Sequence, residues 1–422
     1  MKKLLPLLAL TTPLASPADV INMFDVFASS REDWSTTGTQ GENGWTYGYY
    51  DNTNNPNVFV PFDQALHWNA NNWDHGFNGG ANTNAPWTSI QRTSGHPNTT
   101  AFTNAGVADP GPDFHAVRRY TVPAGVSGQV GIDWHVLKNN GNGTGVTGNI
   151  LHNGSVIDTR TIGGSDNTGA TAGTGFTTVS VSPGDFIDIA LTPDGAGGAG
   201  DASDASNFAM DIGFISPTNS TLIADSVADW TTNATQGENG WSYGYFDVTN
   251  SGSAVGDFIP FDAGMWNGGA NKWDIGGGAP WTEVGETAGH PNGLNNGAEH
   301  WATRRYEIGT GEAGDLYVEF SFGASNRGGA GVGLNILHNG SIVAAHNIDG
   351  NDAAGMNRSV LIPGAQEGDI IDIALTPVGA NGNTADGSDG SFFSASIYVV
   401  PEPGTLGLIS LAGLALILRR RR

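Results

Sequence analysis

The sequence predicts an all-β protein built as two tandem antiparallel β-sandwiches. The segment from Gln40 to Tyr49 (QGENGWTYGY) returns as Gln236 to Tyr245 (QGENGWSYGY), so the chain contains an internal duplication. In both segments apolar residues alternate with Thr, Ser and Gly, which is the pattern of a strand with one buried face. The 64 glycines suit many short strands joined by tight turns, and long helices are not expected.

The first 18 residues have the organisation of a secretory signal peptide. Met1-Lys2-Lys3 forms a charged start, residues 4–15 are mostly apolar, and the small residues Ser16-Pro17-Ala18 follow as a cleavage site. Two prolines within the apolar run argue against the alternative of a buried N-terminal helix. We therefore expect export and removal of residues 1–18.

The first repeat is expected to span residues 19–217 and the second residues 218–399, with a short linker near 216–220. The same short motifs occur in both repeats in the same order, and the spacing between them drifts by a few residues, as loops do on a common framework. The matched motifs begin at Asp33 and Asp229, Pro61 and Pro260, Trp73 and Trp273, Pro86 and Pro280, Gly95 and Gly289, Arg118 and Arg304, Ile150 and Ile336, and Ile187 and Ile371.

The later half of each repeat is the easier part to assign. Residues 130–134 and 316–322 alternate as strands, and residues 149–157 form two short strands around Asn153-Gly154, a strong hairpin signal. The earlier segment 52–84 is rich in Asn and Gly with isolated tryptophans. We expect it to form long loops over one end of the sandwich instead of a second sheet.

The C-terminus, residues 400–422, has three parts. Pro401-Glu402-Pro403 is followed by an apolar run over residues 406–418 and by four arginines, 419–422. Thirteen apolar residues are short for a membrane span of about 20, although flanking residues can extend them into a hydrophobic sorting helix. The arrangement resembles the PEP-CTERM sorting signal of certain Gram-negative bacteria, which is read by an exosortase.

This resemblance implies export, cleavage near Pro401, Glu402 and Pro403, and a final place at the cell surface or in an extracellular matrix rich in exopolysaccharide. The implied partners are the exosortase and the secretion machinery. Contact with the membrane is expected only through the C-terminal segment before processing.

The repeats themselves resemble galactose-binding-like jelly-rolls and other non-catalytic carbohydrate-binding modules. The resemblance rests on the Trp-x-Tyr-Gly-Tyr strand, the His-Pro turn, the Arg-Arg-aromatic strand and a late Gly-Asp strand. It spans most of the chain but is diffuse, and it implies jelly-roll-like sandwiches with an extracellular polysaccharide as ligand.

Acidic residues greatly outnumber basic ones. The chain has 41 Asp and Glu against 17 Lys and Arg, for a formal net charge of −24, and six of the basic residues lie at the two termini. Such a surface repels phosphate backbones, so nucleic-acid binding is excluded, while divalent cations are attracted. No cysteine is present, so disulfides cannot contribute to stability.

Aromatic and histidine residues are the candidate ligand contacts. The aromatics of the repeated strand, such as Trp45 and Tyr47, are expected in the core, whereas tryptophans in the loops could stack on sugar rings. The histidines of the Gly-His-Pro-Asn turns are either contacts or ordinary loop residues, and no zinc spacing is present. The candidate contacts are Trp73, Trp87, Trp273, Trp281, His96 and His290.

Two acidic loops are candidate calcium sites. Asp201 and Asp204 precede the last strand of the first repeat, and Asp386 and Asp389 occupy the matching place in the second. Carboxylates with hydroxyl and carbonyl oxygens in a Gly-rich loop suit calcium, although the spacing fits no complete calcium-binding motif. Turn-stabilising aspartates explain the same pattern, so both readings stay open.

The paired arginines at Arg118-Arg119 and Arg304-Arg305 stand out in such an acidic chain. Strand alternation places one arginine of each pair inward, where a buried carboxylate such as Glu42 or Glu238 would pair with it. Contact with an acidic polysaccharide is the alternative.

Three classes of function are compatible with these features: a carbohydrate-binding protein, a purely structural surface protein, and a polysaccharide lyase or glycosidase. A glycosidase needs two carboxylates facing one cleft, and the candidates present in both repeats are Glu42 with Asp74 and Glu238 with Asp274. Retention of every motif in both repeats suits repeated binding better than a single active site. We expect the protein not to be an enzyme.

Overall fold

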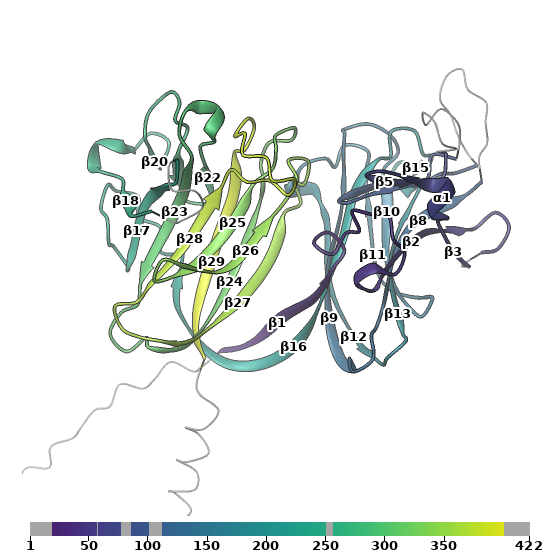
Figure 1. The fold of residues 1–422 in the computed structure, drawn as a ribbon, viewed down its shortest axis with the longest axis horizontal. Helices are drawn as coiled ribbons and strands as arrows, with labels where there is room; N and C mark the ends of the chain where they lie inside the picture. Colours follow the sequence, from purple (N-terminus) through teal and green to yellow (C-terminus); the bar gives the residue numbers. More distant parts are fainter. Residues whose placement is uncertain (1–18, 57, 77–85, 101–111, 250–255, 401–422) are drawn as a thin grey trace, which may run out of the picture.

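The computed structural model describes residues 19–56, 58–76, 86–100, 112–249 and 256–400, and it confirms two antiparallel β-sandwiches side by side (Figure 1). The predicted signal peptide (1–18) and the sorting segment, including Pro401, Glu402 and Pro403, lie outside the described residues. Within the described part, no helix is both long and apolar enough to cross a membrane.

Each sandwich contains one six-stranded sheet. In the first repeat its order is β11-β10-β13-β8-β2-β3, and in the second it is β26-β25-β28-β23-β17-β18, the same arrangement with equivalent strands. The strands are β2 (Trp45–Asp51), β3 (Phe59–Pro61), β8 (Phe114–Thr121), β10 (Val146–His152), β11 (Ser155–Ile162), β13 (Phe186–Thr192), β17 (Trp241–Asp247), β18 (Phe258–Pro260), β23 (His300–Glu307), β25 (Gly333–His338), β26 (Ser341–Asn347) and β28 (Ile370–Thr376).

The second sheet of each sandwich, which packs against the six-stranded sheet, continues through β16 into that of the other repeat, so the two form one large sheet. In the first repeat it contains β12 (Gly173–Val181), β9 (Gly128–Lys138), β16 (Ser206–Asp225), β1 (Asp19–Ser29), β7 (Ser94–His96), β6 (Ser89–Gln91), β5 (Asn72–Asp74) and β4 (Trp68–Asn69). In the second it contains β27 (Met356–Ala365), β24 (Gly314–Ala324), β29 (Ser391–Val400), β22 (Ala288–His290), β21 (Glu283–Gly285), β20 (Lys272–Asp274) and β19 (Trp266–Asn267).

Helical structure among the described residues is limited to single turns. These are α1 (Gln64–His67), η1 (Glu42–Gly44), η2 (Gly169–Thr171), η3 (Ala263–Met265) and η4 (Leu294–Asn296), and a small two-stranded ribbon is formed by β14 (Asp194–Gly195) and β15 (Gly198–Ala199). The absence of long helices in this part matches the prediction from glycine content and turn spacing.

Strand β16 belongs to both sandwiches. Its first part pairs with β9 over Ser206–Phe214 and with β1 over Asp211–Ser220, and its last residues, Thr221–Asp225, pair with β29. The expected linker near residues 216–220 is therefore wrong, because these residues lie inside a continuous strand. β16 is the last strand of the first repeat and the first strand of the second, and Figure 1 shows it with β1 as the bridge between the sandwiches.

The segment 52–84 also differs from its prediction as loops alone. Its described residues contain β3, β4 and β5, and β4 and β5 extend the large sheet through β6 and β7. These strands have only two or three residues each, and their flanking Asn and Gly residues hide the alternation that a longer strand would display.

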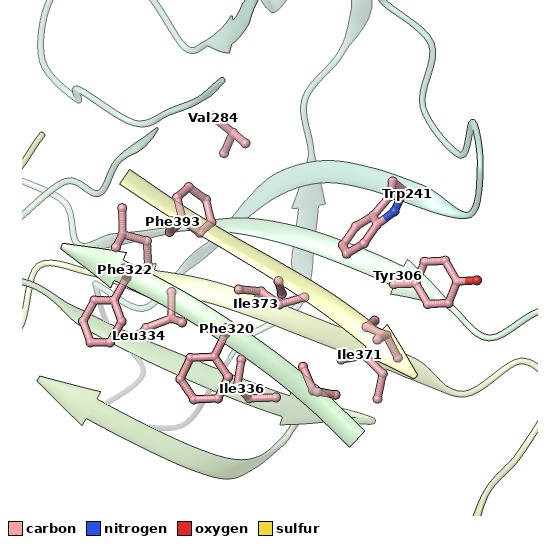
Figure 2. Close-up of a cluster of buried hydrophobic side chains, with 14 of the residues drawn as sticks. Trp241, Val284, Tyr306, Phe320, Phe322, Leu334, Ile336, Ile371, Ile373 and Phe393 are labelled. Carbon is pink, nitrogen blue, oxygen red and sulfur yellow. The ribbon is translucent and has the colours of Figure 1, made fainter. Parts of the chain in front are cut away.

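The core of each sandwich lies between its two sheets. Trp45 and Tyr47 of the repeated strand are fully buried, as predicted, and so are Trp241 and Tyr243. Figure 2 shows the second core, where Trp241 and Tyr306 from one sheet face Phe320 and other rings from the other sheet. Burial of each such side chain contributes roughly 1.5–3 kcal/mol. The hairpin at Asn153-Gly154 is also confirmed, with positive φ angles of 50° and 82° that suit a type I′ turn.

The arginine pairs take buried partners, though not the expected ones. Arg118 is buried and donates to main-chain carbonyls of the loops around Ser30 and residues 91–94, while Arg119 forms a two-point ion pair with Asp188 at 2.8 Å. The second repeat repeats both arrangements with Arg304, Arg305 and Asp372. The predicted pairing with Glu42 or Glu238 is wrong, because the neighbouring strand β13 or β28 places a carboxylate directly opposite the arginine.

Charged side chains are buried between the two repeats. Arg31 donates to Asp211 at 3.1 Å and, across the interface, to Asp352 at 2.8 Å. Arg358 of β27 reaches back to Asp211 at 2.7 Å and to Glu32 at 3.0 Å. Asp211 thus holds an arginine from each repeat, which fixes the two sandwiches against each other.

Candidate functional site

At one end of each sandwich the Gly-His-Pro-Asn turn lies between two other predicted features, the segment with the loop tryptophan and the acidic loop. We call residues 95–99 and 289–293 the His-Pro turns. In the first repeat the side-chain oxygen of Asn98 accepts the N–H of Trp87 at 2.9 Å, and the N–H of Thr99 donates to Asp201 at 3.0 Å. The turn therefore joins the tryptophan segment to the acidic loop, although the three are far apart in sequence.

The second repeat builds the same junction. Asn292 accepts the N–H of Trp281 at 2.8 Å, and the N–H of Gly293 donates to Asp386 at 3.0 Å. The amides of Asn295 and Asn296 also donate to Asp386, each at 2.7 Å. The carboxylate of Asp386 is thus fully used in holding the His-Pro turn in place.

The two histidines lie at the ends of β7 and β22 and act locally. The Nδ1 atom of each ring lies 2.5 Å from the carbonyl oxygen of the next residue, so Nδ1 carries the proton and donates. Burial, with a smaller contribution from the charge of Lys138, outweighs the hydrogen bond to the Pro97 carbonyl and lowers the pKa of His96 to about 4, so this ring is neutral at pH 7. Half-buried rings in this geometry orient the His-Pro turns.

Two of the four candidate tryptophans are in the core, which corrects the prediction for them. Trp73 in β5 and Trp273 in β20 have no exposed surface, and each ring stacks nearly parallel on a phenylalanine, Phe62 or Phe261, at 6.0 and 6.1 Å. The period of two in a strand turns these rings toward the core. They cannot contact a polysaccharide in the folded protein.

Trp87 and Trp281 remain at the surface. Trp281 is 45% exposed, and Trp87 is half-buried. Leu294, 49% exposed in η4, follows the same His-Pro turn in the second repeat. The loops next to β20 and β22, at the upper end of the second repeat in Figure 1, therefore carry exposed apolar side chains.

The four candidate calcium ligands are all buried, and they do not act alike. Asp204 forms a buried ion pair with the ammonium of Lys138 at 2.7 Å, so in the first repeat a lysine stands where a metal was predicted. Burial raises the pKa of Asp201 and of Asp204. Across the described ranges, no group of three or more His, Cys, Asp or Glu side chains could hold a metal ion, so any site here must use main-chain oxygens.

The carboxylates considered for catalysis serve local turns. Asp74 accepts the N–H of Gly76 at 2.9 Å, and Asp274 accepts that of Gly276 at 2.9 Å and pairs with Lys272 at 3.2 Å. Asp74 is also almost completely buried. These contacts give both aspartates a structural role at the ends of the short strands β5 and β20.

A groove between the repeats was not predicted. It has a volume of about 460 Å³ and contains apolar rings and acidic groups from both sandwiches. Burial, with the nearby charge of Asp211, raises the pKa of Asp133 in its wall to about 6. Neither repeat alone contains a signal for it, because β1, β9 and β12 form one side and β24 and β27 the other. The main lining residues are Phe24, Asp133, Phe176, Tyr317, Glu319 and Arg358.

Comparison with solved structures returns several proteins with carbohydrate-binding modules. One is the M60 catalytic domain with two CBM51 domains of ZmpB from Clostridium perfringens, at 11% identity over 91% of this chain and 39% of that chain, with a TM-score of 0.20. The present chain thus spans well under half of that structure. Another is the tandem CBM51 pair of a family 98 glycoside hydrolase from Streptococcus pneumoniae, at 13% identity over 91% and 100%, with a TM-score of 0.20.

A third is a family 35 carbohydrate-binding module from Clostridium thermocellum, at 15% identity over 26% of this chain and 82% of that one, with a TM-score of 0.17. No curated protein matches the chain.

Residues 399–422 match the PEP-CTERM protein-sorting motif. The chain therefore carries a PEP-CTERM sorting motif at its C-terminus, which marks it as an exported, exosortase-sorted cell-surface protein.

Proposed function

We propose that the protein binds an extracellular polysaccharide, without catalysis, at the His-Pro end of each sandwich, on the surface or in the matrix of a Gram-negative bacterium. The observation that carries this proposal is Trp281, a large apolar ring that is 45% exposed while its backbone is held by Asn292. An exposed ring on a backbone that is already held loses less entropy when a sugar stacks on it, and its flat face suits the C–H groups of the sugar.

The two repeats are expected to contribute unequally. Trp87 occupies the matching position in the first repeat but is less exposed than Trp281, so the second repeat is the stronger site. Both sites belong to one rigid unit, because β16 runs through both sandwiches. Two weak sites on one chain gain affinity for a repeating polymer by avidity.

The test is a glycan array followed by titration of any glycan that binds. Trp281→Ala is expected to weaken binding by roughly thirtyfold, which corresponds to about 2 kcal/mol for an anchoring aromatic. Leu361→Ala is the matched control, because Leu361 is equally exposed, at 46%, on β27 away from the His-Pro turn. Equal binding by both variants, or no glycan bound by the wild-type protein, would contradict the proposal.

A purely structural role at the cell surface is the second candidate. The observation that favours it is the rigid join between the repeats, with a shared strand and a buried arginine–aspartate network. A wild-type protein that binds no glycan but is retained in the surface layer would support this role.

A further inference from the structure

The acidic loops of the two repeats have the same backbone but different surroundings. In the first repeat Asp204 is held by two side chains: Lys138 donates to it at 2.7 Å and the hydroxyl of Thr144 at 3.2 Å. The lysine ammonium also donates to the carbonyl oxygen of Ser203 at 2.6 Å. This buried cation is thus bound by one carboxylate and at least one main-chain oxygen.

Strand register identifies the matching residues of the second repeat. Lys138 lies opposite Ser206 in the pairing of β9 with β16, and Ala324 lies opposite Ser391 in the pairing of β24 with β29. Ser206 and Ser391 both donate to the carbonyl of the loop aspartate, Asp204 or Asp389, at 2.9 Å. Ala324 therefore takes the place of Lys138.

The second donor is also replaced by alanine. Gly143 and Gly145 flank Thr144, and Gly329 and Gly331 flank Ala330 in the same sequence pattern. A Cβ atom on Gly143 would meet Asp204, and one on Gly329 would meet Asp389 in the same way. Ala330 therefore stands at the position of Thr144. Both side-chain donors to the carboxylate are absent in the second repeat.

Asp389 is nevertheless retained and buried. It is 1% exposed, and among the described residues neither of its carboxylate oxygens has a hydrogen-bond partner. An ionised carboxylate left in such a place costs several kcal/mol unless a cation accompanies it.

The loop backbone also keeps the geometry that faces the cation. Ser203 and Ser388 both adopt the left-handed conformation, with φ angles of 64° and 69°, which non-glycine residues rarely take. In the first repeat this conformation directs the carbonyl of Ser203 toward the lysine ammonium. Because Ser388 shares this backbone conformation, its carbonyl is expected to face the same position in the second repeat, where none of the described residues supplies an ammonium.

We propose that the second repeat binds a calcium ion at Asp389, in the position that the Lys138 ammonium occupies in the first repeat. The carboxylate of Asp389 and the carbonyl oxygen of Ser388 are its protein ligands, and waters complete the shell. Only oxygen donors are present, which suits calcium, and the two negative charges of Asp386 and Asp389 balance the charge of a divalent ion. In the first repeat the ammonium of Lys138 balances the charge of Asp204 in the same way.

The test is thermal unfolding and calorimetric titration of the full chain with CaCl2 after treatment with EDTA, at constant ionic strength. We expect one calcium ion per chain and a melting temperature that rises with calcium concentration. Asp389→Asn keeps the shape of the side chain but removes its charge, and it should weaken calcium binding at least tenfold. Asp204→Asn is the matched control and should leave the calcium response intact.

A second variant tests the equivalence of lysine and metal. Ala324→Lys should remove the calcium response, because the new ammonium fills the site, and a double change of Lys138→Ala with Thr144→Ala should create a second calcium site in the first repeat. The proposal is overturned if calcium has no effect on the wild-type protein, if Asp389→Asn leaves the response unchanged, or if potassium at equal ionic strength acts as strongly as calcium. Because the readout involves no glycan, it is independent of the proposed polysaccharide binding.

Discussion

Trp273 and Trp281 lie eight residues apart in a Gly-rich segment of the second repeat, yet their environments are opposite. Trp273 is in β20, where it stacks on Phe261 and touches Tyr243 within the core. Trp281 follows Pro280 in a loop, and its backbone N–H donates to the side chain of Asn292. At the scale of single residues, a side chain in a strand is directed by the pleat, whereas a side chain in a loop is directed by the hydrogen bonds of its backbone.

Alanine substitution should separate these two tryptophans. Trp273→Ala removes a fully buried ring and is expected to lower the free energy of unfolding by about 3–5 kcal/mol. Trp281→Ala removes an exposed ring and should change it by less than about 1 kcal/mol. Urea denaturation of both variants checks this, and equal losses of stability would show that Trp281 is a packing residue.

The His-Pro turns act as junctions at the scale of structural elements. In the second repeat, Asn292 joins the Trp281 segment to the backbone near Ala298, to which its amide donates at 2.5 Å, while the next residue joins Asp386. Asn292 is completely buried, so its bonds have no competition from water. The exposed ring and the acidic loop therefore share one support.

Asn292→Ala should release this support. Loss of a buried side-chain hydrogen-bonding partner is expected to lower the free energy of unfolding by about 1–3 kcal/mol and to weaken any glycan binding through Trp281. A double-mutant cycle with Trp281→Ala is the decisive measurement, because residues that act through one another are not additive. Purely additive losses in affinity would mean that Asn292 does not position Trp281.

The whole molecule is a rigid pair because the large sheet continues through β16 and because buried charges cross between the repeats. Arg31 is the central residue of this contact: it is 4% exposed, and its guanidinium reaches Asp211 in one repeat and Asp352 in the other. Removing one partner of such a network lowers the free energy of unfolding strongly, because the remaining charges stay buried without a counter-charge.

Arg31→Met should therefore loosen the pair. We expect a loss of about 3–5 kcal/mol and a split of the single unfolding transition into two, one for each sandwich. Scanning calorimetry measures the transitions, and small-angle X-ray scattering should find a larger radius of gyration. Arg160→Met is the control, because 42% of the Arg160 side chain is exposed and its ion pair with Asp158 lies within one repeat.

The contact between the repeats should also weaken in acid through Glu32. Burial raises the pKa of this carboxyl, but the hydrogen bond from His346 and the charge of Arg358 outweigh burial and lower the pKa to about 2. The ordinary value is 4.5, so ionised Glu32 stabilises the folded state above pH 4.5, and this contribution is lost as the pH falls toward 2.

Glu32→Gln removes this titration. The wild-type protein should exceed the variant in stability by roughly 2 kcal/mol at pH 6, after allowance for the partial exposure of Glu32, and the difference should disappear near pH 2. Urea denaturation of both proteins across this pH range gives the comparison. A difference that stays constant with pH would exclude the pKa shift as its cause.

The sequence alone determined the features that depend on near neighbours and on repetition. Alternation identified the strands, the buried rings Trp45 and Tyr47 and the all-β class, while Asn153-Gly154 identified its hairpin, because each signal lies within a few residues. The Pro401-Glu402-Pro403 motif with its apolar and basic tail was equally local. The duplication was visible for the same reason, since matching segments repeat whole.

Only the tertiary structure decided which distant groups meet. The pairing of Lys138 with Asp204 joins residues 66 positions apart, and the sharing of β16 and the groove between the repeats each need both sandwiches. Short strands such as β5 place Trp73 in the core through contacts with Phe62 and Tyr47, which no local pattern encodes. Burial and pairing follow from the packing of sheets, so the sequence determined the strands while their assembly decided which side chains remained free to bind.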